Sequence, residues 1–473
     1  VAPNWEVQTN CEQPMRITFV RPNMYTGRSD DAMEPLVFGI LAGLTPPDVE
    51  CQLIDERLEE VHDDIDADLV AITAETYTAR RGYQIATACE RRGVPVVLGG
   101  YHPTFRPREA LQFASAVVVG DAEEVWPAII EDARRGALQR LYRSPFPTLS
   151  GSRVERSIFR GKRYQPVSLV QFGRGCRYAC DFCSIHAFYG STLRWRPVAD
   201  VVRELETLAR PYVFFTDDNL FNNGEELRRL LAAIRPLRKR WSCQASLDVA
   251  ADGELVRLMA NSGCLSVMIG FESLDVDNLK QMRKSWNRKH GAYDHLVRVF
   301  RDQGIMVYGG FVLGYDHDTL ASFDRTLEFA VRNQLFLANF NPLTPTPGSA
   351  LYDRLAVEGR LIHDPWWLDS EFRYGDGMFR PRHMTPEQLH EGCYRIRTEF
   401  NRAGSLIHRA LDLRANCRTP LHAFAYLLAN LTSRREIHRK QGQPLGDSQQ
   451  PLEPVYLPTG FARETSLLPH LSS

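Results

Sequence analysis

The chain has 473 residues, of which 44% are hydrophobic and 24% are charged, and its formal net charge is −1. These values are typical of a soluble globular protein with two or three domains, and the near-neutral charge argues against a nucleic-acid-binding protein, which usually carries a basic domain. The sequence has no apolar run of the ~20 residues that a bilayer-spanning helix needs. Its N-terminus lacks the basic start and apolar core of a signal peptide, so we expect no transmembrane segment and a cytoplasmic location.

Residues 15–143 alternate short apolar strands with helical stretches, after an N-terminal tail at 1–14. The expected strands are, in order, MRITFV, VECQLIDE, DADLVAITAE, VPVVLGG and SAVVVGD. This alternation predicts an α/β domain with a doubly wound parallel sheet, Rossmann-like in topology. Ligands of such sheets bind outside the carboxyl ends of the strands.

Small and polar residues follow three of these strands. Thr76 and Tyr77 follow the third strand, Gly99 and Gly100 the fourth, and Gly120 the fifth. Glycines at these points let the backbone approach a large flat or phosphorylated ligand closely. A flavodoxin-like scaffold without that ligand would use the same glycines in its tight turns, so the residues alone leave both interpretations open.

A Pro- and Arg-rich linker at 144–165 leads into a second series of β–α repeats at 166–375. Its expected strands are 168–172, YVFFTDDN, WSCQASLD, LSVMIGFES, GIMVYGGFVLG and FLANFNPLTP. Six parallel strands with helices outside predict a partial (β/α)6 TIM barrel that is open on one side. In barrels the reactive groups gather at the carboxyl ends of the strands.

Three cysteines in one loop are the strongest chemical signal in the chain. Cys176, Cys180 and Cys183 directly follow the first strand of the expected barrel. Three thiolates at this spacing can bind three irons of a [4Fe–4S] cluster, whereas a structural cluster normally has four cysteine ligands. The fourth iron is then free to bind and activate a second molecule.

Zinc bound with a distant histidine, or a redox pair, is the alternative for these thiols. Zinc motifs usually supply their ligands as two separated pairs, and the sequence has no second pair. The other seven cysteines are scattered singly, so we expect buried structural thiols and no disulfide framework.

Further polar and small residues mark the ends of the next barrel strands. They are Thr216, Asp217 and Asp218 on the second strand, Gln244 and Ser246 on the third, Glu272 on the fourth, and Gly310 and Leu313 on the fifth. Gln244 and Ser246 are alternate residues and therefore point to one face. A purely structural interpretation is also open, since Asp and Asn at such points often cap the following helix.

The C-terminal part is expected to be helical at 376–440, with apolar residues at three- and four-residue spacing. The aromatic residues of Pro365-Trp366-Trp367 and Phe372-Arg373-Tyr374 precede it. They are expected either to pack in a core or to cover the open side of the barrel. Residues 441–473 are rich in Gln, Pro and Ser and are expected to be mobile.

With Phe182 directly before the last cysteine, the cysteine loop resembles the signature of the radical S-adenosylmethionine (SAM) enzymes. The parallel sheet in front of it makes the arrangement similar to the cobalamin (B12)-dependent class of that superfamily. The resemblance extends from about Met15 to Leu355 and includes Gly270-Phe271-Glu272-Ser273, which resembles the family's fourth-strand element.

The resemblance implies three cofactors or cosubstrates: a [4Fe–4S] cluster on the three cysteines, SAM chelated to the open iron, and cobalamin at the ends of the first sheet. By the same resemblance, the SAM contacts would be Thr216, Asp217, Asp218, Gln244, Ser246, Glu272, Gly310 and Leu313, and the cobalamin contacts Thr76, Tyr77, Gly99, Gly100 and Gly120. The D-x-H-x-x-G motif of other cobalamin carriers is absent, since the second strand ends in Asp55-Glu56-Arg57-Leu58. The cobalt would therefore have no lower histidine ligand.

This family includes hopanoid methylases, antibiotic-pathway C-methylases and an anaerobic bacteriochlorophyll ring cyclase. The resemblance therefore implies radical C-methylation of a small or lipid-like metabolite, with an electron donor such as flavodoxin or ferredoxin. Radical ring formation, rearrangement or carbon–carbon coupling without methyl transfer is the main alternative. A non-catalytic Fe–S redox or corrinoid-carrier protein is a third.

Overall fold

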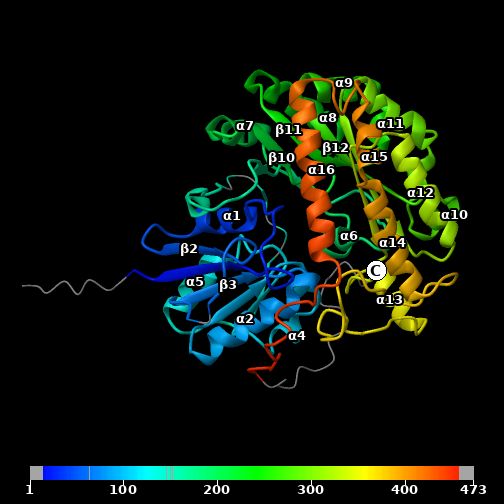
Figure 1. Ribbon diagram of the computed structural model, residues 1–473. Helices are drawn as coiled ribbons and strands as arrows, with labels where there is room; N and C mark the ends of the chain where they lie inside the picture. The colour runs from blue at the N-terminus through cyan, green and yellow to red at the C-terminus, as the bar shows by residue number, and fades with distance from the viewer. Residues whose placement is uncertain are drawn as a thin grey trace, which may run out of the picture.

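The computed structural model describes residues 14–456 except 63, 145, 147, 150 and 152. Two six-stranded parallel sheets organise it, one in each half of the chain (Figure 1). Residues 1–13 of the expected N-terminal tail and residues 457–473 of the expected C-terminal tail lie outside the described residues. No helix among the described residues is both long enough and apolar enough to cross a membrane.

The first sheet has the strand order β2-β1-β3-β4-β5-β6, and all its neighbours are parallel. The strands are β1 (Arg16–Arg21), β2 (Glu50–Asp55), β3 (Leu69–Thr73), β4 (Val96–Gly99), β5 (Ala116–Val119) and β6 (Leu141–Arg143). The helices are α1 (Leu36–Leu44), α2 (Ala79–Arg91), α3 (Tyr101–Phe105), α4 (Pro107–Ala110) and α5 (Trp126–Arg134), with the 3-10 turn η1 (Thr76–Thr78). The order reverses between β1 and β3, as expected for a doubly wound sheet.

Two apolar cores cover the faces of this sheet. The first contains Phe19, Phe38 and Trp126, from β1, α1 and α5. The second contains Tyr83 of α2 and Phe113 after α4, whose rings stack at 4.4 Å. The predicted α/β fold is confirmed, and β6 is the one strand of this sheet that the sequence analysis did not expect, because it has only three residues.

The second sheet has the order β14-β13-β12-β11-β10-β7 and forms the expected partial barrel. Its strands are β7 (Ser168–Val170), β10 (Tyr212–Phe215), β11 (Arg240–Ala245), β12 (Cys264–Glu272), β13 (Met306–Leu313) and β14 (Leu337–Pro342). The short strands β8 (Gly173–Arg174) and β9 (Arg194–Trp195) form an antiparallel pair beside the cysteine loop.

The strands of the barrel are joined by helices. These are α6 (Ser184–Tyr189), α7 (Val198–Thr207), α8 (Gly224–Ile234), α9 (Gly253–Asn261), α10 (Val276–Gln281), α11 (Tyr293–Asp302), α12 (Leu320–Arg332) and α13 (Ala350–Val357), with the 3-10 turns η2 (Ser157–Phe159), η3 (Arg235–Leu237), η4 (Leu247–Ala251) and η5 (Ser285–Arg288). Alternate strand residues such as Val267, Ile269 and Phe271 are fully buried against the helices. The residues between them face the barrel interior, because successive strand side chains point to opposite faces.

Three helices follow the barrel: α14 (Pro386–Phe400), α15 (Ala403–Ala410) and α16 (Pro420–Lys440). Tyr426 of α16 packs with Leu265, Met306 and Phe336 near the beginnings of β12, β13 and β14. Helix α16 runs along the barrel toward the first domain (Figure 1). There Arg439 pairs with Asp30 at 2.9 Å.

Two late segments pack onto the first domain, which the expected boundaries did not anticipate. Trp366, Trp367 and Phe372 belong to the same apolar core as Tyr83, and the Trp367 indole N–H donates to Glu109. They therefore pack in a core, which is one of the two roles expected for them. Residues 441–456 follow a defined course along α2, where the side-chain amide of Gln84 donates to the carbonyl of Asp447 at 2.8 Å. The mobility expected for 441–473 stays a prediction.

Candidate functional site

The three predicted cluster cysteines line one cavity of about 280 Å³ at the carboxyl ends of the barrel strands. Cys176, Cys180 and Cys183 come from the loop between β8 and α6, and no fourth cysteine is among the residues of this lining. Burial raises the pKa of Cys180 to about 12 and that of Cys183 to about 11. Metal must therefore replace a proton on each thiol, since the thiolate is the ligand.

This donor set fits an incompletely ligated iron–sulfur cube. Within the described residues, no three Cys, His, Asp or Glu side chains converge on a single ion-sized point. A cube takes each cysteine on a different iron, so its ligands need to line a common cavity and need not meet at one point. Three thiols in the lining would leave the fourth iron open toward the remaining volume.

The strand-end carboxylates hold the backbone of the cysteine loop. Asp217 accepts hydrogen bonds from the backbone N–H groups of Phe172 (3.0 Å) and Gly173, and Asp218 accepts one from Gly175 at 2.8 Å. Burial raises the pKa of Asp217 to about 7 and that of Asp218 to about 6. Asp217 lies outside the lining of the cysteine cavity, whereas Asp218 is part of it.

Four of the other predicted SAM contacts line the cysteine cavity: Gln244, Ser246, Glu272 and Gly310. Leu313 does not, because it is buried in the apolar core outside the barrel interior. Asn219, which the sequence analysis left unassigned, donates to Ser246 at 3.1 Å and also contacts the sulfur of Cys176 at 3.7 Å. The amide of Asn219 thus connects Ser246, which directly follows β11, with the cysteine loop.

Lys284 is the main residue of this cavity that the sequence analysis missed. Its Nζ lies 3.0 Å from Glu272 Oε1, and both side chains are nearly buried. The ammonium group also lies 5.0 Å from the ring centroid of Trp286, and this ring stacks on Tyr178 of the cysteine loop at 3.5 Å. The sequence signal was available in the charged stretch MRKSW, which follows α10 in a loop at the ends of the strands.

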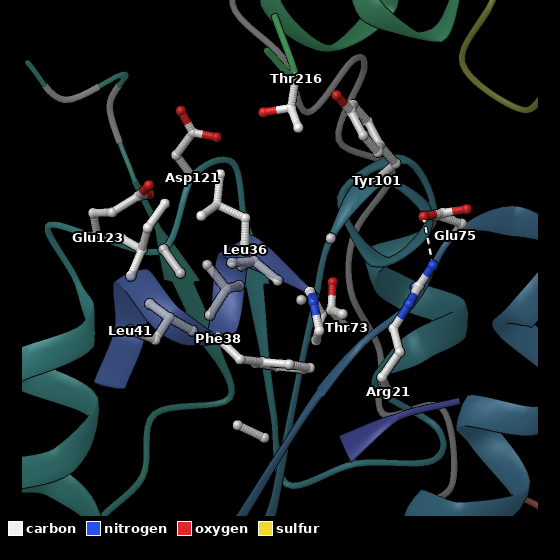
Figure 2. A pocket seen from close by; sticks show the side chains of 18 of the residues that line it. Arg21, Leu36, Phe38, Leu41, Thr73, Glu75, Tyr101, Asp121, Glu123 and Thr216 are labelled. Carbon is white, nitrogen blue, oxygen red and sulfur yellow. Dashed lines mark hydrogen bonds and ion pairs between the residues drawn. The ribbon is translucent and has the colours of Figure 1, made fainter. Parts of the chain in front are cut away.

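A second cavity of about 490 Å³ opens at the carboxyl ends of the first sheet (Figure 2). The predicted Gly99, Gly100 and Gly120 line it. Gly100 has φ +101°, and a Cβ there would lie 2.8 Å from the carbonyl oxygen of Ala74. Glycine is therefore required for the close approach of two strand-end loops.

The same cavity has a polar mouth and an apolar arm. Arg21 and Glu75 form an ion pair at 2.9 Å in the mouth (Figure 2). The arm runs between α1 and the sheet and is lined by Leu36, Phe38, Leu41, Ala71, Val97, Val118 and Trp126. Cobalamin combines a large amide-bearing ring with an aromatic base. The polar mouth fits the ring, and the apolar arm fits the base.

Thr76 and Tyr77 lie outside this lining. The hydroxyl of Thr76 is 3.3 Å from His102 Nδ1 in the core. Tyr77 contacts Thr344 after β14 at 3.3 Å and packs on Trp366. Both residues thus contact other protein groups, and Glu75 beside them lines the cavity instead.

The two cavities share one wall residue, Asp218, and Thr216 of the same strand end lines the first-domain cavity. Tyr101, which follows β4, packs on Phe188 of α6 with ring centroids 4.8 Å apart. The ends of the two sheets therefore face each other. Asp218 lies between the cysteine cavity and the first-domain cavity.

The comparisons with known proteins agree with this geometry. The radical SAM superfamily model matches residues 170–330, and the B12-binding domain model matches residues 40–130. The solved structure of the radical SAM methyltransferase TsrM from Kitasatospora setae covers 73% of this chain and 76% of its own, with a TM-score of 0.59 and 19% identity, and shows the shared fold.

Two curated relatives extend over most of the chain. Bacteriochlorophyllide d C-12(1)-methyltransferase of Chlorobaculum tepidum is 29% identical over 86% of this chain and 92% of its own. Hopanoid C-2 methylase of Rhodopseudomonas palustris is 26% identical over 70% of this chain and 66% of its own.

The protein is a radical SAM enzyme. It belongs to the branch in which a B12-binding domain precedes the radical SAM domain. Its cofactors are those of the two domains: a [4Fe–4S] cluster with SAM in the barrel, and cobalamin on the first sheet.

Proposed function

We propose that the enzyme is a cobalamin-dependent C-methyltransferase that acts on an unactivated carbon of a small or lipid-like metabolite. The proposal rests on one observation: Asp218 lines both the cysteine cavity and the first-domain cavity. When bound, the cofactors supply a 5′-deoxyadenosyl radical on one side and a methyl group on the other. A substrate between the two cavities would be within reach of both.

The chain's own residues bind and orient these groups. We assign Cys176, Cys180 and Cys183 to the cluster. Lys284 supplies a positive charge for a carboxylate in the same cavity, and its partner Glu272 fixes the position of that ammonium group. Holding both reaction partners in one orientation is the main contribution that a protein makes to such chemistry.

Aromatic rings in edge-to-face contact lie at the junction between the domains. Phe188 and Tyr189 of α6 pack on each other, and Phe188 also packs on Tyr101 and Phe105 of α3. Apolar rings at this place exclude water from the space near the two cavities. Water exclusion protects a reactive carbon from side reactions.

The named relatives support methyl transfer over the alternatives. One is named for a bacteriochlorophyllide and the other for a hopanoid, so we propose an acceptor with a large apolar framework. Flavodoxin or ferredoxin is the proposed source of the single electron that each turnover requires.

The test is product analysis with the anaerobically purified holoenzyme, candidate acceptors of these two classes, and SAM labelled with deuterium on its methyl group. We expect 5′-deoxyadenosine, S-adenosylhomocysteine and a labelled methylated product in equal amounts. Formation of 5′-deoxyadenosine with an altered but unmethylated acceptor would establish the ring-forming or rearranging alternative instead.

Cysteine variants test the assignment of the cluster. Cys176→Ala should remove both iron and 5′-deoxyadenosine formation, because the cube loses one of three ligands. Cys417→Ser is the matched control, since this partly buried cysteine precedes α16 and lies outside both cavity linings. Full turnover in Cys176→Ala would exclude the proposed function.

A further inference from the structure

Large apolar side chains are exposed together on α15, α16 and the turn between them. The exposed fractions range from 39% to 72%, and the residues are Ile407, Leu411, Leu413, Phe424, Leu427, Leu428 and Leu431. We call these seven residues the apolar patch. Outside the patch, the large apolar residues found exposed in the described chain are single ones on other elements: Val37, Val276, Leu320 and Val357. Isolated exposed residues are ordinary, whereas a group of this size marks an interaction site.

The helical period places the α16 part of the patch on one face. Phe424, Leu427, Leu428 and Leu431 follow the spacing i, i+3, i+4, i+7, so they lie along one side of the helix. The opposite side contains the buried residues Tyr426 and Asn430. Asn430 donates to the carbonyl of Phe336 at 3.1 Å and Tyr426 donates to that of Leu406 at 2.8 Å. The helix therefore cannot rotate to bury the patch without breaking these contacts.

Most charges around the patch are positive, and one of the arginines, Arg414, pairs with Asp302 of α11 at 2.9 Å. Exposed arginines lie directly before α15, between α15 and α16, and on α16 beyond its apolar face: Arg402, Arg414, Arg418, Arg434 and Arg435. The single acidic residue in 402–435 is Asp412. It is buried and forms an ion pair with Arg301 at 2.9 Å. The surface thus combines a solvent-facing apolar stripe with a basic rim.

We propose that the patch and its basic rim dock the enzyme onto an anionic lipid membrane. An interfacial helix of this kind inserts its apolar face at the boundary of headgroups and acyl chains, while arginines contact the lipid phosphates. A second copy of the chain would be a poorer partner. In a symmetric dimer the same basic rim would face itself, and like charges across an interface are unfavourable.

The docked helix also contacts the first domain. Glu436 of α16 accepts a hydrogen bond from the backbone N–H of Asp30 at 3.0 Å, and Lys440 pairs with Asp31 at 2.7 Å. Docking through α16 would thus bring both domains to the bilayer surface. The inference depends on this surface alone and does not rest on methyl transfer.

The test is flotation of the full-length, cluster-loaded protein with vesicles under anaerobic conditions. The vesicles are phosphatidylcholine alone or phosphatidylcholine with one third phosphatidylglycerol. We expect binding to the anionic vesicles, weak binding to the neutral ones, and release at high salt because the arginine contacts are screened. Leu427→Ser combined with Leu431→Ser should lower the vesicle-bound to free ratio on the order of tenfold or more, since two apolar groups no longer insert.

Two further variants separate docking from misfolding. Val357→Ser changes a residue that is 90% exposed and lies outside the patch, so it should bind vesicles as the wild type does. Arg434→Glu combined with Arg435→Glu changes two exposed side chains and should lose binding to anionic vesicles while keeping its iron content and melting temperature. If the double serine variant loses its iron, its loss of binding could come from misfolding. The double glutamate variant then tests whether the patch docks on anionic vesicles.

The proposal is overturned if the wild-type protein does not float with anionic vesicles, or if it floats equally well after both double substitutions. It is also overturned if light scattering shows a wild-type dimer that the leucine substitutions convert to a monomer. That result would assign the patch to a second copy of the chain.

Discussion

Arg174, two residues before Cys176, forms an ion pair with Asp121 of the first domain, with Nη1 3.0 Å from Oδ2. Asp121 also pairs with Arg194 of β9 at 2.8 Å and accepts a hydrogen bond from Tyr189 of α6 at 3.1 Å. The side chains of Arg174 and Asp121 are both nearly buried. The cysteine loop is therefore attached directly to the loop that follows β5, and the geometry of one domain depends on the other.

Asp121→Asn should uncouple the two domains. The substitution leaves the guanidinium groups of Arg174 and Arg194 without their shared carboxylate, which we expect to cost about 3 kcal/mol of stability. Methylated product should fall more than 5′-deoxyadenosine, because the cysteine loop stays attached to the barrel through Asp217 and Asp218. Thermal unfolding and product ratios measure both effects.

Asp48→Asn is the control for this prediction. Asp48 pairs with Arg134 on the surface, and exposed pairs contribute only about 0–1 kcal/mol. If Asp121→Asn behaved like Asp48→Asn in both measurements, the coupling between the domains would have another origin.

Lys284→Met should weaken SAM binding on the order of tenfold while the iron content stays close to that of the wild type. The variant removes the positive charge from the cysteine cavity and leaves Glu272 without its partner, and hydrogen bonds to charged groups contribute about 1.5–3 kcal/mol. Equilibrium dialysis of SAM against the reconstituted protein measures the effect.

Lys284→Arg retains the charge and should recover part of the affinity. Lys280→Met, on the exposed surface of α10, should bind SAM normally. An unchanged dissociation constant in Lys284→Met would limit Lys284 to a structural role.

Gly175→Ala should prevent correct formation of the cysteine loop. Gly175 has φ +91°, and its Cβ would lie 2.2 Å from the carbonyl oxygen of Thr192. Gly161 has a similar φ of +81° with nothing within 4 Å of its Cβ, so Gly161→Ala carries the backbone strain without the steric clash. We expect iron loss in the first variant and near-normal iron in the second, measured by metal analysis. Equal iron content in the two variants would show that the cysteine loop can accommodate the added methyl group at position 175.

The first domain should become less stable as the pH drops below neutral, because His102 is buried. This side chain is fully buried, its Nε2 lies 2.9 Å from Glu109, and burial lowers its pKa below the usual 6.5. The unfolded chain then binds more protons than the folded one, so stability is present above about pH 6.5 and is lost as the pH falls through the folded pKa. The slope in this range is at most about 1.4 kcal/mol per pH unit.

His102→Gln should flatten the melting temperature between pH 7 and pH 5, and the exposed His290→Gln should leave the wild-type slope unchanged. A wild-type slope in His102→Gln would mean that another group causes the pH dependence in this range. The lowered pKa of Glu109 acts at lower pH and in the same direction.

The sequence by itself determined the two parallel sheets, the three cysteines that line one cavity and the glycines of the first-domain cavity. Strand alternation, helical period and cysteine spacing are local properties, and the carboxyl ends of parallel strands meet at one edge in any such sheet. Gln244 and Glu272 were predicted for the same reason, because each stands at the end of its strand and faces the barrel interior.

Only the tertiary structure decided which side chains meet across loops. Lys284 pairs with Glu272 through a loop beyond α10, and Asp121 meets Arg174 from another domain. Tyr77, placed beside the cofactor by its position after β3, packs instead on Trp366, which comes from nearly three hundred residues later in the chain. These contacts depend on how distant segments pack, and a local pattern carries no information about a partner so far away in the sequence.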